Sequence, residues 1–169
     1  YPKMYLTGHS KGGNLAVYAY IKNPELQGYI EGVKSFDGPG FVDGFWQGDE
    51  DISKITNYIP KDSIVGRVLH HREQTKIMDA QGSGLAQHDT LMWSVDVKDF
   101  NYCDALTKES NDLLEYVNKL LLDCPVEEKE RYCHLIGELF DRMKIRTIAD
   151  LTEFSFKQAL SGIKEIRQL

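Results

Sequence analysis

A serine flanked by glycines stands close to the start of the chain. The residues from Gly8 to Gly12 read Gly-His-Ser-Lys-Gly, with Ser10 at the centre and Gly13 directly after them. In a G-x-S-x-G sequence between a strand and a helix, the serine occupies a strained turn that exposes its side-chain oxygen. We expect glycine to be required at Gly8 and Gly12, because a Cβ there would collide with the adjoining strand and helix. Ser10 is therefore the candidate nucleophile.

The segment has two other interpretations. A glycine-rich turn without catalytic chemistry could bind an anion at the start of the helix. A Walker A phosphate loop is excluded, because Lys11 precedes the glycines and no serine or threonine follows a Gly-Lys pair. A strand pattern before the motif and a helix pattern after it favour the nucleophile.

A serine hydroxyl needs an imidazole that accepts its proton and a carboxylate that orients the imidazole. In this arrangement the chain order is serine, carboxylate, histidine, which excludes His9 as the base. His70 and His71 lie in a segment expected to be extended, and His134 lies in an expected surface helix. His88 follows the glycine-rich residues 81–84, which can fold back over the sheet, so His88 is the predicted base.

The predicted carboxylate is Asp62, which directly follows an expected strand and precedes His88. Asp37 is the rival, since it also follows a strand. Its sequence Asp-Gly-Pro-Gly is typical of a turn, in which Asp37 would bond to its own loop backbone and shape the pocket wall. Asp79 and Asp89 are lesser candidates, because loop carboxylates of this kind usually have no catalytic role.

The oxyanion hole needs two hydrogen-bond donors. One is expected to be the backbone N–H of Lys11, the residue after the nucleophile. The second should come from an earlier strand-to-helix loop, and none precedes Tyr1. We therefore expect the chain to begin in mid-domain. Loss of one donor lowers turnover by about 10² to 10³, so we expect weak catalysis from this fragment.

These residues must be positioned by a sheet with helices on its faces. Strand patterns occupy Lys3–Thr7, Glu31–Phe36 and Lys54–Ile59, a helix pattern occupies Asn14–Ile21, and two further segments look extended, Ile64–His71 and Thr75–Asp79. Strands that alternate with helices predict an α/β fold with a mostly parallel sheet. Phe41–Trp46 is expected to form a short helix or a lid.

The pattern changes to all-helical after about Asp104. Apolar residues at helical spacing predict one helix around residues 113–121 and a second from Pro125 to Met143. A third is expected near residues 155–166, where Ser155 and Gln158 have the spacing of a capping box. We therefore expect residues 1–122 to belong to the sheet-containing domain and residues 123–169 to form a helical appendage.

Composition excludes several classes of function. The net charge is −6, and no cluster of Lys and Arg is interleaved with aromatic residues, which argues against nucleic-acid binding. No apolar run approaches the roughly 20 residues that span a bilayer. Neither HExxH nor paired His/Cys spacing occurs, so we expect no metal and no cofactor. The three cysteines, Cys103, Cys124 and Cys133, lack CxxC spacing and favour a reduced, cytoplasmic setting.

From Lys3 to Trp93 the sequence resembles class III lipases and, more closely, a lipase-like family of uncharacterised bacterial proteins. The resemblance rests on the block around Ser10, the Phe36–Gly40 turn, the Asp62 turn, and Gln87-His88 followed shortly by Trp93. It implies a truncated α/β-hydrolase fold and an ester-cleaving triad of Ser10, Asp62 and His88.

Two departures from this family pattern affect the expectations. Lys11 stands where these lipases commonly have leucine, which places a charge beside the nucleophile. The N-terminal strands of the family are missing, so the strand Lys3–Thr7 would expose an apolar edge. We expect self-association, pairing with a missing N-terminal segment, or aggregation to cover this edge.

Two functions from different classes remain open. The first is a serine hydrolase that cleaves small-molecule or lipid esters through an acyl-enzyme. The second is a non-catalytic binding or scaffolding module that uses the C-terminal helices as its interaction surface. Four aromatic residues could line an acyl pocket or lid, or else pack in the core: Phe41, Phe45, Trp46 and Trp93.

Overall fold

The computed structural model describes residues 3–123 and, beyond them, 125, 127–128, 130–131, 134, 137–138, 141 and 146–147. The chain divides into two compact units, Tyr1–Asp123 and Cys124–Leu169. The division lies one residue from the boundary expected from the sequence. The interpretation of the first unit as part of a hydrolase domain stays a prediction.

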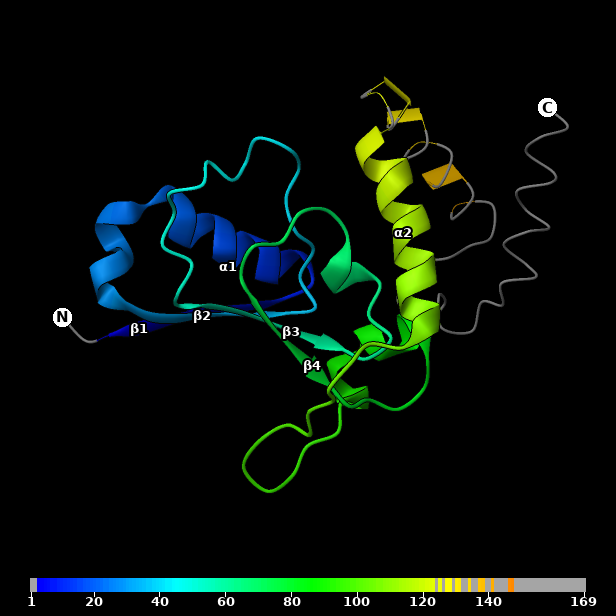
Figure 1. Ribbon diagram of the computed structural model, residues 1–169, viewed down its shortest axis with the longest axis horizontal. Helices are drawn as coiled ribbons and strands as arrows, with labels where there is room; N and C mark the ends of the chain where they lie inside the picture. Colours follow the sequence, from blue (N-terminus) through cyan, green and yellow to red (C-terminus); the bar gives the residue numbers. More distant parts are fainter. Residues whose placement is uncertain are drawn as a thin grey trace, which may run out of the picture. The chain divides into compact units, whose positions relative to one another are not determined.

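The first unit is built on a four-stranded sheet in which each strand pairs with the next one along the chain (Figure 1). The strands are β1 (Met4–His9), β2 (Ile30–Phe36), β3 (Ile55–Pro60) and β4 (Gln74–Met78). All three pairings are parallel, which confirms the expected α/β class. Because parallel strands point the same way, the segments that follow all four strands meet at one edge of the sheet.

The helix α1 (Lys11–Lys22) begins one residue after β1 and packs against β1 and β2 (Figure 1). Its apolar residues Val17, Tyr20 and Ile21 share a buried cluster with Val33 and Ile55 of the sheet. Burial of each such side chain contributes about 1.5–3 kcal/mol. This cluster holds α1 against the sheet.

A second buried cluster consists of Tyr58, Met78, Ala80 and Trp93, with Phe36 packed against it. Side chains of successive strand residues point to opposite faces, so Phe36 lies on the face opposite to Val33. Trp93 is 4% exposed and belongs to this core. Its position favours packing over a place in an acyl pocket.

The segment from Phe41 to Trp46 forms a turn, so the expected short helix is wrong. The rings of Phe41 and Phe45 are stacked, and Trp46 contacts both of them edge-on. Phe41 is buried in the cluster on α1, and the other two pack against it. These three aromatic rings therefore extend the core.

The expected extended segment Ile64–His71 is also wrong. It contains the 3₁₀ helix η2 (Val65–Arg67), and only His70 forms a bridge, with Phe41. The cause lies in two buried side chains. Asp37 accepts a hydrogen bond from the Gly66 N–H, and the Asn57 amide donates to the Gly66 carbonyl. The polar backbone groups of this turn are therefore bound by side chains instead of a neighbouring strand.

The helix α2 (Lys108–Asp123) matches the helix predicted around residues 113–121. In the second unit, the described residues between 127 and 141 have helical backbone, in line with the second predicted helix. The helix expected near residues 155–166 lies outside the described residues. None of the helices that the structure describes is long and apolar enough to cross a bilayer.

Candidate active site

Ser10 lies in the turn between β1 and α1, with φ 56° and ψ −128°. Such a backbone conformation costs a non-glycine residue about 1–3 kcal/mol, and packing on both sides must hold it in place. The Ser10 N–H donates to the Phe36 carbonyl at 2.9 Å, and the Ser10 carbonyl accepts from Gly13 N–H at 2.9 Å. The Ser10 side chain makes no capping hydrogen bond to α1, so the helix does not occupy its hydroxyl.

The glycines around Ser10 differ in whether a side chain would fit at their positions. A Cβ on Gly8 would lie 2.2 Å from the Gly12 carbonyl carbon, and one on Gly13 would lie 2.5 Å from Ser35 Oγ. A Cβ on Gly12 would meet nothing within 4 Å. The collision expected at Gly12 is therefore wrong. The close approach of helix and strand requires Gly8 and Gly13.

His88 is the last residue of the short 3₁₀ helix η3 (Gly84–His88). Its Nδ1 lies 2.7 Å from Asp37 Oδ2, in hydrogen-bond geometry. Because a carboxylate only accepts hydrogen bonds, Nδ1 carries the hydrogen, and Nε2 of a neutral His88 is left as an acceptor. This is the tautomer that a general base next to a serine requires.

Asp37 directly follows β2 and is 1% exposed. Its Oδ1 accepts hydrogen bonds from Ser63 Oγ at 2.5 Å and from the Gly66 N–H at 3.0 Å. These donors come from the segment after β3. The turn sequence had suggested that Asp37 would bond to its own loop backbone, and that expectation is wrong. The carboxylate is thus fixed on one oxygen and presents the other oxygen to His88.

The expected pairing of Asp62 with His88 needs correction, because the structure places Asp37 at the imidazole. Asp62 lies at the same edge, but its Oδ1 accepts from the Thr107 hydroxyl and its Oδ2 accepts from Gln87 Nε2 at 3.4 Å. The reason is the strand order. β2 pairs directly with β1, whereas β3 is a second strand away, about 4.8 Å further from Ser10.

Gln87 is a functional candidate that sequence reasoning treated only as part of a motif. Its side chain is 0% exposed, and its Nε2 donates to the carbonyls of Ala80 and Gly82. Its Oε1 accepts from the Asp62 N–H at 2.9 Å. Gln87 therefore fixes the loop that carries His88. The only signal in the sequence was its position directly before the predicted base, because its burial is visible only in the structure.

The contacts of His88 in the structure include no hydrogen bond to Ser10. The ring of His88 lies against the ring of His9, the residue before Ser10, with 4.5 Å between ring centroids. Catalytic hydrogen bonds in ligand-free proteins are commonly long and shorten when substrate binds. The structure thus brings His88 to the residue before the nucleophile, and the pairing of Ser10 with His88 stays a prediction.

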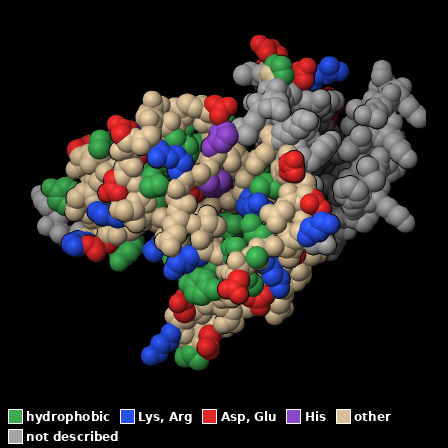
Figure 2. All heavy atoms as spheres, in the orientation of Figure 1, with side chains coloured by type: hydrophobic (Ala, Val, Ile, Leu, Met, Phe, Trp, Pro, Cys, Tyr) green, Lys and Arg blue, Asp and Glu red, His purple; other side chains and the backbone are tan. Residues whose placement is uncertain are grey.

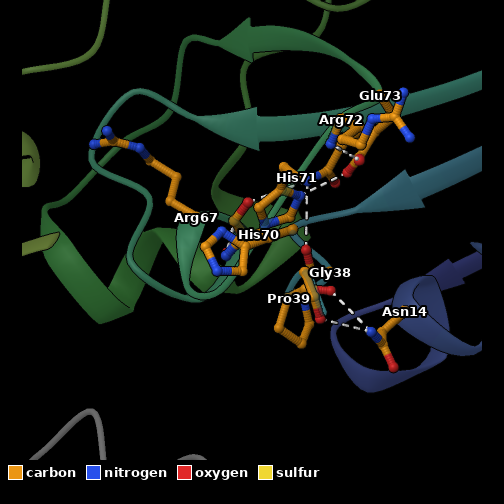
Figure 3. A network of polar contacts seen from close by, with 12 residues as sticks. Asn14, Gly38, Pro39, Arg67, His70, His71, Arg72 and Glu73 are labelled. Atoms are coloured by element: carbon orange, nitrogen blue, oxygen red, sulfur yellow. Dashed lines mark hydrogen bonds and ion pairs between the residues drawn. The ribbon is translucent and has the colours of Figure 1, made fainter. Parts of the chain in front are cut away.

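Lys11, the expected oxyanion donor, is the first residue of α1. The N–H groups of the first helical turn have no partner within the helix, so the Lys11 N–H is available to a ligand. Its ammonium group donates to Asn14 Oδ1 at 2.7 Å. Figure 3 shows the Asn14 amide facing the turn after Asp37, where it donates to the carbonyls of Pro39 and Gly40.

The remaining histidines lie apart from this arrangement. His71 Nδ1 contacts Glu73 Oε1 at 2.6 Å, in the network that Figure 3 shows. His70 Nε2 lies 2.7 Å from Asp43 Oδ1 but without hydrogen-bond geometry. His134 is exposed and pairs with Glu138 one helical turn away. Their exclusion as the base agrees with these contacts.

Charges of both signs alternate on the face that Figure 2 shows, and histidine side chains lie near its middle. Among the described residues, no group of three or more His, Cys, Asp or Glu side chains is arranged to hold a metal ion. Cys103 is a free thiol whose pKa is raised, chiefly by burial. Cys124 and Cys133 lie outside the described residues.

The chain was compared with known protein families, curated proteins and solved structures. A family model described as Mbeg1-like matches residues 1–141. No curated protein and no solved structure matches the chain.

Proposed function

We propose that this chain, which belongs to the Mbeg1-like family, is a serine hydrolase that cleaves carboxylic esters. The proposal is supported by the strained Ser10 turn and the Asp37–His88 pair. The substrate class is a small-molecule or lipid ester. The proposed architecture is that of an α/β-hydrolase related to the class III lipases, supported by the parallel sheet and by the position of Ser10 between a strand and a helix.

The observation that carries this proposal is the 2.7 Å contact between His88 Nδ1 and Asp37 Oδ2. The two residues are 51 positions apart in the sequence, and both lie at the sheet edge where β1 ends at the nucleophile turn. A buried carboxylate against one imidazole nitrogen fixes the other nitrogen as a proton acceptor. A purely structural ion pair does not require a strained serine beside it.

The reaction follows from these positions. Ser10 Oγ attacks the acyl carbonyl carbon while its proton passes to His88 Nε2, and Asp37 stabilises the resulting imidazolium. The Lys11 N–H donates to the oxyanion. His88 returns its proton to the leaving alcohol as the C–O bond breaks. Water then gives one proton to His88 while its oxygen bonds to the acyl carbon. His88 passes that proton to Ser10 Oγ as the bond between Oγ and the acyl carbon breaks, which releases the acid and restores Ser10.

A fluorophosphonate probe tests the proposal directly, because it reacts only with a serine activated by a base. We expect labelling of the wild-type chain and its loss in Ser10→Ala. The matched control is Ser53→Ala, which removes an exposed serine hydroxyl outside this site and should keep full labelling. A panel of short to long acyl esters then defines the substrate.

The non-catalytic binding module makes the opposite prediction for the same experiment. A folded wild-type chain that neither reacts with the probe nor hydrolyses any ester of the panel would refute the hydrolase proposal. It would leave the strained turn as a binding feature.

A further inference from the structure

A second imidazole contacts the base. His9 is the last residue of β1 and directly precedes Ser10. Its Nε2 lies 2.7 Å from the backbone oxygen of His88, and the two rings are 4.5 Å apart with an interplanar angle of 37°. His9 thus touches both the main chain and the side chain of the base. The proposed mechanism does not use it.

The chemistry of this contact fixes the role of each atom. A backbone carbonyl only accepts hydrogen bonds, so His9 Nε2 must carry the hydrogen and donate it to His88. The neighbouring carbonyl of Gln87 accepts from Trp93 Nε1 at 2.8 Å. Two side-chain donors therefore hold consecutive carbonyls at the end of η3.

His88 needs such support because of where it stands. η3 is a short 3₁₀ helix, and the residues that follow it, Thr90 to Met92, are exposed. Asp37 holds one nitrogen of the His88 ring, and the Gln87 and Trp93 contacts hold the residue before it. The backbone carbonyl of His88 itself needs a further donor. The His9 donor fixes that backbone, and it does so from the residue next to the nucleophile.

We propose that His9 is a positioning residue whose Nε2–H donor sets the distance between His88 and Ser10. The inference rests on the proposed function, because it assigns His9 a part in proton transfer between those two residues. His9 is not itself the base, since its Nε2 is occupied as a donor and Asp37 pairs with His88.

Three substitutions of His9 distinguish the effect of its N–H donor from the effect of its ring. His9→Gln keeps an N–H donor that reaches the same place and removes the ring. His9→Phe keeps a ring against His88 and removes the donor. His9→Ala removes both. The matched control is His134→Gln, which removes an exposed imidazole from the other compact unit.

The measurement is the kcat and KM of each full chain with a p-nitrophenyl ester. We expect His9→Phe and His9→Ala to lose about 10- to 100-fold in kcat with KM unchanged, since a misplacement of about 1 Å costs up to 10²-fold. We expect His9→Gln to stay within about threefold of wild type. Equal activity of His9→Phe and wild type, or an equal loss in His9→Gln and His9→Ala, would overturn the proposal.

A second readout works whether or not the chain hydrolyses esters. In a proton NMR spectrum, the proton on His88 Nδ1, which is hydrogen-bonded to Asp37, should be protected from exchange with solvent in wild type and in His9→Gln. It should exchange faster in His9→Phe and His9→Ala. Unchanged protection in all variants would refute the positioning role. If protection is lost only in the variants without an N–H donor, but the wild-type chain hydrolyses no ester, only the hydrolase proposal is refuted.

Discussion

At the scale of single residues, the carboxylates of Asp37 and Asp62 lie at one edge of the sheet and contact different partners. Asp37 contacts His88, and Asp62 contacts the Thr107 hydroxyl and Gln87. Chain order alone could not separate them, because both follow a strand and both precede His88. The separation depends on which strand pairs with β1, and that pairing is a property of the folded sheet.

These contacts predict unequal losses on neutralising the two carboxylates. Asp37→Asn should lower kcat by about 10⁴, because an amide can donate to His88 Nδ1 and stabilise the wrong tautomer. Asp62→Asn should cost far less, because Asp62 acts on His88 only through Gln87. Steady-state kinetics of the two variants, with thermal unfolding to verify folding, make the comparison. A larger loss in Asp62→Asn would restore Asp62 as the acid.

The glycines beside Ser10 provide a second residue-scale prediction. Gly13→Ala should lower the free energy of unfolding by about 1–3 kcal/mol, because its Cβ would lie 2.5 Å from Ser35 Oγ and 3.0 Å from the Gly8 carbonyl oxygen. Gly12→Ala is the matched control, since its Cβ meets open space and alanine favours a helix. Urea denaturation of both variants measures the difference. Equal stability of the two variants would contradict the packing described for Gly13.

At the scale of elements, hydrophobic patterning predicted the strands and the two described helices, because burial of one face decides their positions. It failed for Ile64–His71, which reads as extended but is bound by the side chains of Asp37 and Asn57. Patterning reports which residues are buried. It does not report that a buried carboxylate and amide will bind the backbone of a segment in place of a strand.

The segment before β4 carries a pH-dependent contact. The side chain of Glu73 is 4% exposed. Burial alone would raise the pKa of Glu73, yet hydrogen bonds from His71 and the Arg72 N–H lower it below 4.5. A carboxyl group whose pKa is lower in the folded state stabilises the fold above its unfolded pKa. That contribution is lost as the pH falls through the folded pKa.

We therefore expect Glu73→Gln to be less stable than wild type at pH 7. The difference should shrink as the pH falls below 4.5 and through the lower pKa of Glu73 in the folded state, because the protonated carboxyl group is then uncharged like glutamine. Urea denaturation at several pH values measures this, with the exposed Glu115→Gln as the control. A difference that is independent of pH would show that the Glu73 charge does not matter.

At the scale of the whole molecule, β1 is an edge strand of the described sheet. Tyr5 on this strand is 63% exposed and Met4 is 49% exposed. An exposed edge with apolar side chains is a ready site for pairing with another strand. The self-association expected from the sequence is consistent with this edge and stays a prediction.

Analytical ultracentrifugation tests that prediction. We expect the sedimentation coefficient of the wild-type chain to rise with concentration and Tyr5→Lys to reduce the effect, because a charged edge opposes strand pairing. Tyr18→Lys, an exposed tyrosine on α1, is the matched control. A wild-type chain that sediments as a monomer at every concentration would contradict the prediction.

The strand order also determines when the site can exist during synthesis. Each strand pairs with the one made just before it, so the sheet can grow from its N-terminal end as the ribosome releases the chain. Ser10 emerges first, Asp37 second and His88 last. In the proposed mechanism, the Ser10 hydroxyl therefore has no base until the loop of His88 has left the exit tunnel.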